Sequence, residues 1–397
     1  MNLRLTEEQT LIEASVRSLL DGEYSFAQRQ RSIEAPDGCR SELWAKFADM
    51  GWLALPLSEE AGGLGGGALE TGLLMRAFGR HLVVEPYLAC AVLAGGVVAG
   101  MGRPGQVSAW LPGLMEGRLR LAVAHEEASQ RNPWERAKTS AVRRGEKWEL
   151  RGAKRLARGA LGADALLVTA TEVASGAAPE QERVFLVSPG TPGLNIQAKR
   201  CTDGAHAADL KLDGVLVPGV DLLDAGSPEA LHAILARSIV ALCWEAVGAM
   251  TAALEMTVGY AHQRVQFGRA LIQFQVVEHR LAEMAVCCEE SLAACEMAAL
   301  RLDRGDADVA GLASMAKAKV GRCARFVAQQ AVQLHGAMGV TEELPIASYF
   351  RRLMAFTQQS GATDWHAQAF AEGQLRNSGW RYSRTLPVDG KRAGEVA

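Results

Sequence analysis

The residue types best suited to binding a dinucleotide occur in two short stretches of the C-terminal half of the chain. In the first stretch, Arg264 and Phe267 are three residues apart at the end of a predicted helix, so we expect their side chains to share one face. A guanidinium can hold a diphosphate through paired hydrogen bonds, and an adjacent aromatic ring offers a flat surface to adenine or ribose. The spacing alone leaves open the alternative that Arg264 is a solvated surface charge.

The second stretch is rich in glycine. Gln333 stands three residues before Gly336, and Gly339 follows three residues later. Glycines at such positions let backbone N–H groups approach a ligand closely. The same pattern is expected where Gly336 only ends a helix, so this stretch also has a purely structural interpretation.

A third glycine-rich stretch, Gly62–Gly67, lacks the context of a phosphate-binding loop. No Lys-Ser or Lys-Thr pair follows it, and no strand rich in β-branched residues precedes it. We therefore predict a loop between two helices.

The spacing of apolar residues predicts three regions and a tail. Residues 1–118 show helical spacing, with a capping box formed by Thr6 and Gln9 and a second helix that ends at Gly51. Residues 119–225 change to a period of two, which is typical of strands, and Pro-Gly pairs mark turns between them. This middle region is predicted to be a small β barrel or sandwich.

Residues 226–385 return to helical spacing, and short loops between long helices predict an antiparallel four-helix bundle. The longest predicted helices cover residues 228–262, residues 273–304, and the stretch from an Asp306 cap to Leu334. The tail, residues 386–397, is polar and is predicted to be unordered. The predicted fold class is α+β, mainly α, with the order helical domain, β domain, helical bundle.

Composition excludes several classes of protein. The chain has 397 residues, 49% of them hydrophobic, and a formal net charge of −3, which gives no basic face for nucleic acid. The first residues lack the apolar run of a signal peptide, and the charge-free stretch Pro86–Gly102 is predicted to be a buried helix, not a membrane span. Eight cysteines without a CxxC pair predict reduced core thiols in a cytoplasmic protein and no metal site.

The two dinucleotide stretches resemble motifs of the acyl-CoA dehydrogenase family. The similar segments are Tyr260–Gly268 with its continuation Phe274–Gln275, and Gln333–Glu342. Phe185–Leu194 resembles part of the family's β domain, and the order of the three regions matches too, so the resemblance covers nearly the whole chain. The chain is most similar to small subunits such as that of pimeloyl-CoA dehydrogenase. This implies the acyl-CoA dehydrogenase fold, with FAD as cofactor for α,β-dehydrogenation of an acyl-CoA thioester.

The resemblance assigns one role to both motifs. In the family, these residues reach across a dimer interface and hold the ADP half of the FAD bound by the neighbouring subunit, whereas the flavin half is held by a subunit's own β domain. Ala337 replaces a usual glycine and weakens the second motif slightly. The cofactor-binding residues implied in this way are Arg264, Gln266, Phe267, Gly268, Gln275, Gln333, Gly336, Ala337 and Gly339.

The family's catalytic base is absent at both of its usual positions. Removal of the α-proton of the thioester requires a carboxylate base. The common position, a Glu before a Gly, falls on Ser360, and the alternative, nine residues before a Val-Gly pair, falls on Ser238. A serine hydroxyl cannot take a proton from carbon near neutral pH without a base of its own.

The family's flavin-holding segments are changed as well. His125–Gln130 stands where the family has a Thr-Glu-Pro segment, and Arg155–Ala157 stands where it has Trp-Ile-Thr. Loss of a general base alone typically lowers the rate by ~10²–10⁴-fold. A nearly complete ADP-binding motif beside these losses favours a division of labour between two kinds of subunit.

Three hypotheses about the function remain open. In the first, the chain is the small subunit of an α2β2 enzyme of steroid or dicarboxylate catabolism, and a second acyl-CoA dehydrogenase subunit supplies the flavin cradle and the base. In the second, the chain is a complete homomeric enzyme whose base has moved to Asp364 or Glu245. In the third, it is a dehydrogenase-like scaffold without redox chemistry. The resemblance implies an electron-transferring flavoprotein as electron acceptor. The identity of the substrate's acyl group stays open.

Overall fold

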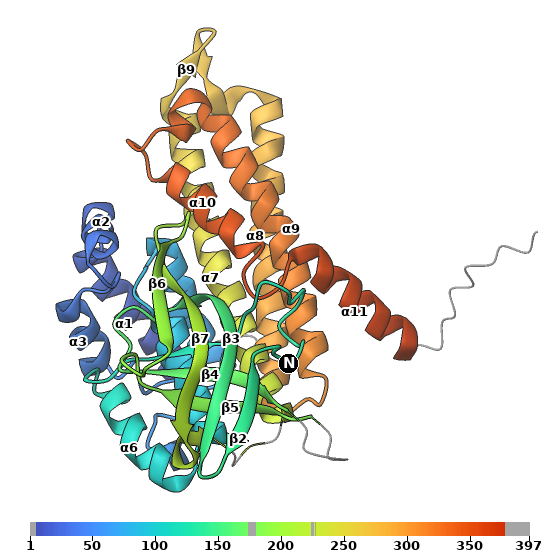
Figure 1. The fold of residues 1–397 in the computed structure, drawn as a ribbon. Helices are drawn as coiled ribbons and strands as arrows, with labels where there is room; N and C mark the ends of the chain where they lie inside the picture. The colour runs from blue at the N-terminus through green and yellow to red at the C-terminus, as the bar shows by residue number, and fades with distance from the viewer. Residues whose placement is uncertain (1–4, 174–179, 224–225, 227, 378–397) are drawn as a thin grey trace, which may run out of the picture.

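The computed structural model describes residues 5–173, 180–223, 226 and 228–377. Helices come first, then a β domain, then a second set of helices (Figure 1), as the sequence predicts. The tail predicted to be unordered, residues 386–397, lies outside the described residues.

The N-terminal helical domain begins with the predicted capping box. The Thr6 side chain accepts a hydrogen bond from the Gln9 backbone N–H at 3.2 Å, and the Gln9 side chain accepts one from the Thr6 N–H at 2.9 Å. The stretch predicted to be a buried helix, Pro86–Gly102, forms a π-helical segment, Leu88–Ala94, that continues into α5. The helices are α1 Glu7–Glu23, α2 Phe26–Glu34, α3 Ser41–Asp49, α4 Ala68–His81, α5 Gly95–Met101 and α6 Pro104–Met115.

The glycine-rich stretch before α4 is an inter-helix loop, as predicted. It folds back on residues 54–57 through backbone hydrogen bonds, including one from the Gly66 N–H to the Leu55 carbonyl at 2.8 Å. A Cβ on Gly63 would lie 2.3 Å from the Leu57 carbonyl oxygen. Its glycines therefore serve close backbone packing.

The β domain is one sheet whose central strand is buried on both faces. The order is β6-β7-β3-β2-β4-β5-β8, and β1 also pairs with β4; β1 and β2 run parallel to β4, and the other pairs are antiparallel. Along β4, Leu166 and Val168 enter the core of the β domain, whereas Leu167 packs into the helical core. The strands are β1 Leu121–Ala124, β2 Ser140–Arg144, β3 Lys147–Arg158, β4 Ala165–Glu172, β5 Glu182–Val187, β6 Leu194–Arg200, β7 His206–Pro218 and β8 Leu222–Leu223.

The C-terminal bundle is built on three long helices and carries a small hairpin at one end. Its elements are α7 Pro228–Gln263, β9 Val265–Gln266, β10 Arg269–Ala270, α8 Gln275–Asp303, α9 Val309–His335, α10 Ile346–Phe356 and α11 Thr363–Asn377. The predicted cap of α9 was wrong by two residues. Asp308 caps the helix, accepting a hydrogen bond from the Gly311 N–H at 2.9 Å, because it directly precedes the first helical residue. Asp306 instead pairs with Arg301.

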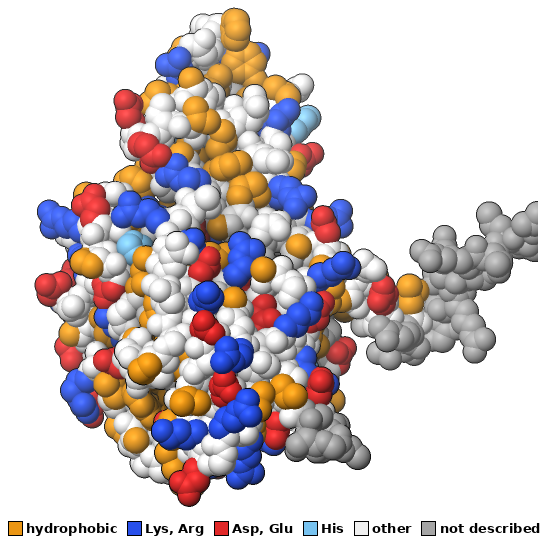
Figure 2. Space-filling model, in the orientation of Figure 1, with side chains coloured by type: hydrophobic (Ala, Val, Ile, Leu, Met, Phe, Trp, Pro, Cys, Tyr) orange, Lys and Arg blue, Asp and Glu red, His pale blue; other side chains and the backbone are white. Residues whose placement is uncertain are grey.

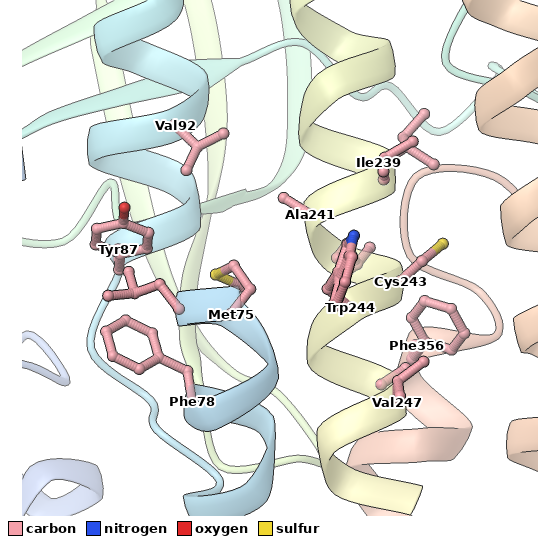
Figure 3. Packing of buried hydrophobic residues seen from close by; sticks show 14 of the residues in the cluster. Met75, Phe78, Tyr87, Val92, Ile239, Ala241, Cys243, Trp244, Val247 and Phe356 are labelled. Carbon is pink, nitrogen blue, oxygen red and sulfur yellow. The ribbon is translucent and has the colours of Figure 1, made fainter. Parts of the chain in front are cut away.

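Helix α7 forms the centre of the molecule. Among the described helices it is the one long and apolar enough to cross a membrane by composition, yet 83% of its most apolar window is buried within the fold. Trp244 on α7 is fully buried and packs over Gly72 of α4, where a Cβ would lie 2.5 Å from the indole. Met75 of α4 belongs to the same core, and the Phe78 ring lies on the side of α4 away from Trp244, beside Tyr87 (Figure 3). One apolar core therefore joins the N-terminal helices to the bundle.

Candidate functional site

The first dinucleotide motif forms the exposed tip of the bundle (Figures 1 and 2). Beyond the end of α7, β9 and β10 pair antiparallel, and Phe267 and Gly268 make the turn with φ angles of 53° and 80°. The Phe267 side chain is 92% exposed. The left-handed region costs a non-glycine residue about 1–2 kcal/mol, so a bulky residue is unexpected there. The prediction that Arg264 and Phe267 share a helix face was wrong, because α7 ends at Gln263 and the hairpin redirects the chain.

Neighbouring side chains support this hairpin without covering Phe267. The Arg269 guanidinium lies over the Phe274 ring at 3.9 Å, and the Phe267 ring meets the same ring edge-on at 6.2 Å. Arg264 is exposed, and within the described part of the chain no acidic side chain pairs with it. The tip therefore presents an uncovered aromatic ring and an unpaired guanidinium.

The second motif lies at the same end of the bundle. His335, the last residue of α9, stacks on Tyr260 in the last turn of α7, with ring centroids 4.4 Å apart. Gly336 adopts φ 61° and ψ −138°, a conformation that side chains disfavour, and a Cβ there would meet open space. Gly339 is buried, and its Cβ would lie 2.7 Å from the Val332 carbonyl oxygen.

The remaining predicted cofactor residues surround these glycines and the hairpin. Gln275 begins α8, Gln333 lies in the last turn of α9, and Ala337 follows Gly336; all three are exposed. The Gln266 side chain donates to the neighbouring Val265 carbonyl at 2.8 Å. The structure thus brings both predicted motifs to one end of the bundle, around the uncovered guanidinium and ring.

A separate cavity of about 590 Å³ lies where the N-terminal helices, the β domain and the bundle meet. Its walls are largely apolar, with Leu88, Val123, Ile239 and Met354 among them. The positions at which the family's catalytic segments are altered meet in this cavity. They are His125, Glu126, Arg155, Leu156, Ala157, Ser238 and Ser360.

Of the two predicted alternative bases, Glu245 lines the cavity but is fully engaged. It is buried, and its two carboxylate oxygens accept from Arg352 Nε and Nη2 at 2.6 and 2.8 Å. Arg352 also contacts Asp203 at 3.2 Å. Burial alone would lower the pKa of Arg352, but the adjacent Glu245 and Asp203 raise it above its ordinary value. Asp364 is exposed in the first turn of α11 and is not part of the cavity wall.

The segment at the family's flavin-holding position uses its polar atoms within the chain. The His125 ring bonds to Thr169 Oγ1 at 3.1 Å and to the Pro133 carbonyl at 2.9 Å. Glu127 accepts from the buried Lys154 ammonium at 2.7 Å and from the Thr139 backbone and hydroxyl at 2.9 and 2.7 Å. The side chains of His125 and Glu127 are therefore already bonded within the chain.

Sequence reasoning missed the position of Glu126. It lines the cavity together with Ser360, which lies far from it in sequence, so no local pattern signals that the two share this site. Burial raises the pKa of the Glu126 carboxyl, against the lowering effect of Arg158.

Comparison with known proteins agrees with this architecture. Models of the acyl-CoA dehydrogenase N-terminal and C-terminal domains match residues 6–118 and 225–375. The acyl-CoA dehydrogenase FadE27 of Mycobacterium tuberculosis is 31% identical over 359 residues, which is 87% of this chain and 88% of that protein. An acryloyl-CoA reductase (NADH) of Anaerotignum propionicum is 26% identical over 95% of this chain and 96% of its own length.

Two solved structures extend the likeness. A variant of the steroid ACAD Tcur3481-Tcur3483 has a TM-score of 0.84 at 28% identity, covering 94% of this chain and 99% of that one. The ChsE4-ChsE5 complex of Mycobacterium tuberculosis gives 0.85 at 25% identity, with 94% and 99% covered. The chain belongs to the acyl-CoA dehydrogenase family. FAD is the cofactor of the chemistry that this family performs.

The two candidate regions differ in how well they fit FAD. The tip offers what the ADP half needs: a free guanidinium, an exposed aromatic ring and a glycine turn. In the cavity, the side chains of His125 and Glu127, in the segment at the flavin-holding position, are bonded within the chain. The residues present therefore fit the ADP half of FAD better than they fit the flavin ring.

Proposed function

We propose that this chain is the small subunit of a heteromeric FAD-dependent acyl-CoA dehydrogenase, and that its bundle tip binds the ADP half of the FAD held by a second subunit. Bound FAD supplies the two-electron acceptor for α,β-dehydrogenation of an acyl-CoA thioester. The observation that carries the proposal is a contrast between two regions. The tip exposes Arg264 and Phe267, whereas the cavity is lined by other residues at the positions of the family's base and flavin-holding segments.

The tip residues have separate tasks in this proposal. Arg264 pairs with the diphosphate, because its guanidinium is exposed and free of acid partners within the described residues. Phe267 places a flat apolar surface beside the adenosine, and the strained turn holds the ring outward. The turn at Gly336 lets its backbone approach the cofactor without a side chain in the way.

The cavity supports the same conclusion, because none of the residues considered as catalytic base is suited to that role. Ser360 and Ser238 occupy the base positions, and neither hydroxyl is a base for a carbon acid. Glu245 has both oxygens bonded to Arg352, and Asp364 lies outside the cavity wall. The two residues that the relocated-base hypothesis needs are therefore poorly placed for proton abstraction.

The proposed partner is a second acyl-CoA dehydrogenase chain in an α2β2 assembly. Support comes from the similar ChsE4-ChsE5 structure, which is a complex of two differently named chains. The likeness to a steroid ACAD favours a bulky acyl group such as a steroid over a dicarboxylate. An electron-transferring flavoprotein is the proposed acceptor.

Purification of the full-length chain alone, and with a co-expressed dehydrogenase-like chain that retains the Glu-Gly and Thr-Glu-Pro segments, tests the proposal. We expect no flavin absorbance and no acyl-CoA oxidation from the chain alone, and both from the pair. Full flavin occupancy and turnover by the isolated chain would contradict the proposal. A stable pair without flavin would favour the non-redox scaffold instead.

A further inference from the structure

Two aromatic rings join the two dinucleotide motifs at the end of the bundle. Tyr260 lies in the last turn of α7, and His335 is the last residue of α9. Their ring centroids are 4.4 Å apart and their planes differ by 25°, which is a stacked geometry. The stack therefore connects two helix ends that are far apart in the sequence.

The His335 ring is held in one orientation. It is only 4% exposed, and its Nδ1 bonds to the Ala331 carbonyl at 2.8 Å, one turn earlier in α9. Burial lowers the pKa of His335, so near neutral pH the ring is uncharged and donates from Nδ1. The imidazole thus presents one fixed, uncharged aromatic face to the Tyr260 ring.

Each ring is connected to one of the two motifs through the backbone. The Tyr260 carbonyl accepts a hydrogen bond from the Arg264 N–H at 2.9 Å, which carries the geometry of α7 up to the start of the hairpin. Gly336 directly follows His335, and its N–H bonds back into the last turn of α9. Gly339 folds back onto the same residue, because a Cβ there would lie 3.1 Å from the His335 Cβ. A shift of either ring would therefore move Arg264 relative to the glycine turn.

We propose that the stack of Tyr260 on His335 holds the Arg264 hairpin and the Gly336 turn together as one surface for the ADP half of FAD. This inference rests on the proposed function and deepens it, because it says how the two motifs keep a fixed separation. A ligand gripped from two sides is bound well only if packing locks the groups that grip it. Tyr260 and His335 are positioning residues, since each acts through the backbone that follows it.

Variants at the two rings separate the stack from a general structural effect. Tyr260→Leu and His335→Leu each remove one ring and keep an apolar side chain. Tyr260→Phe keeps the ring and removes only the hydroxyl. His262→Leu is the control, because it removes an exposed ring from the same last turn of α7. If His335→Leu fails to fold, His335→Gln, which keeps an N–H donor without a ring, takes its place.

Hydrogen exchange in the isolated full-length chain tests whether the stack couples the two motifs. We expect Tyr260→Leu to speed exchange of the Gly336 amide, and His335→Leu to speed exchange of the Arg264 amide. Each change should be about two- to tenfold, which is the contribution of an aromatic pair to an equilibrium constant. Both effects cross from one helix to the other, which a loss of packing within one helix does not predict. Tyr260→Phe and His262→Leu should exchange as the parent does at both amides.

FAD affinity of the co-purified pair of subunits tests the positioning role. We expect Tyr260→Leu to lower the affinity about two- to tenfold, and Tyr260→Phe to leave it unchanged. The loss should be smaller when Arg264→Ala is already present, because the Tyr260 ring acts through Arg264. An equal loss with and without Arg264→Ala would show a merely structural effect and overturn the positioning role.

The inference is also overturned if the Gly336 amide exchanges at the same rate in Tyr260→Leu as in the parent, or if FAD affinity does not differ between them. A parent pair that binds no FAD contradicts the proposed function instead. Exchange in the isolated chain then still decides whether the stack joins the two motifs, so the two failures are distinguishable.

Discussion

At the scale of single residues, the tip combines conformational strain with exposure. Phe267 occupies a left-handed turn and is almost fully uncovered, although burial of an aromatic ring normally stabilises a fold. Backbone strain that is not offset by burial of the side chain is typical of binding sites, where it positions the side chain before the ligand binds. Arg264 is also exposed, and a lone exposed guanidinium adds little to the stability of the fold.

Replacement of Arg264 by alanine should therefore affect the cofactor and not the fold. We expect FAD affinity of the paired enzyme to fall about ten- to hundredfold, because a hydrogen bond to a charged group contributes roughly 1.5–3 kcal/mol. The free energy of unfolding of the chain should change by less than about 0.5 kcal/mol. Flavin fluorescence titration and urea unfolding measure the two quantities. Arg17→Ala, at a side chain 62% exposed on α1, is the control, and equal FAD affinity in both variants would count against the assignment.

His366 should make the stability of the chain depend on pH. Its pKa is lowered to about 4 by burial, against an ordinary value of 6.5, so the unfolded chain binds the proton first as the pH falls. Stability is then lost between about pH 6.5 and 4, by up to about 3 kcal/mol for this group. Urea unfolding at several pH values should show a shallower loss for His366→Gln than for the parent. The exposed His262→Gln should behave as the parent; equal slopes in all three would disprove the role of His366.

At the scale of elements, the close crossing of α4 and α7 depends on glycine. A Cβ on Gly248 would lie 1.8 Å from the Arg76 carbonyl oxygen, and one on Gly79 would lie 1.8 Å from the Glu245 carbonyl oxygen. Each helix therefore places a glycine directly against the backbone of the other helix. This crossing sets the position of Glu245 and hence of one cavity wall.

The variant Gly248→Ala should be strongly destabilising. Overpacking of a tight core typically costs 1–3 kcal/mol, and a backbone atom cannot move aside as a side chain does, so we expect about 3 kcal/mol or more. Gly259→Ala on the same helix is a matched control, because its Cβ would meet no atom within 4 Å. That variant should be neutral or stabilising by up to about 1 kcal/mol, as expected for alanine in a helix. Similar unfolding midpoints for the two variants would contradict this account of the crossing.

At the scale of the whole molecule, local signals were predictable from sequence and long-range contacts were not. The capping box at Thr6 and the left-handed Gly51, two residues beyond the last residue of α3, depend on residues a few positions apart, so pattern reasoning found them. The pairing of Glu245 with Arg352 spans 107 positions and arises only when α10 packs against α7. The cavity that Glu126 and Ser360 both line arises only when the β domain meets the bundle. The shift of the α9 cap from Asp306 to Asp308 shows that even local signals carry an error of a residue or two.

The count of FAD molecules in the intact enzyme tests the central claim most directly. Native mass spectrometry of the co-purified pair reports bound FAD and subunit composition in one experiment. If this chain completes its partner's site and holds no flavin of its own, the assembly carries one FAD for each pair of chains. One FAD for every chain would show that this subunit houses a complete site, and would contradict the division of labour proposed for it.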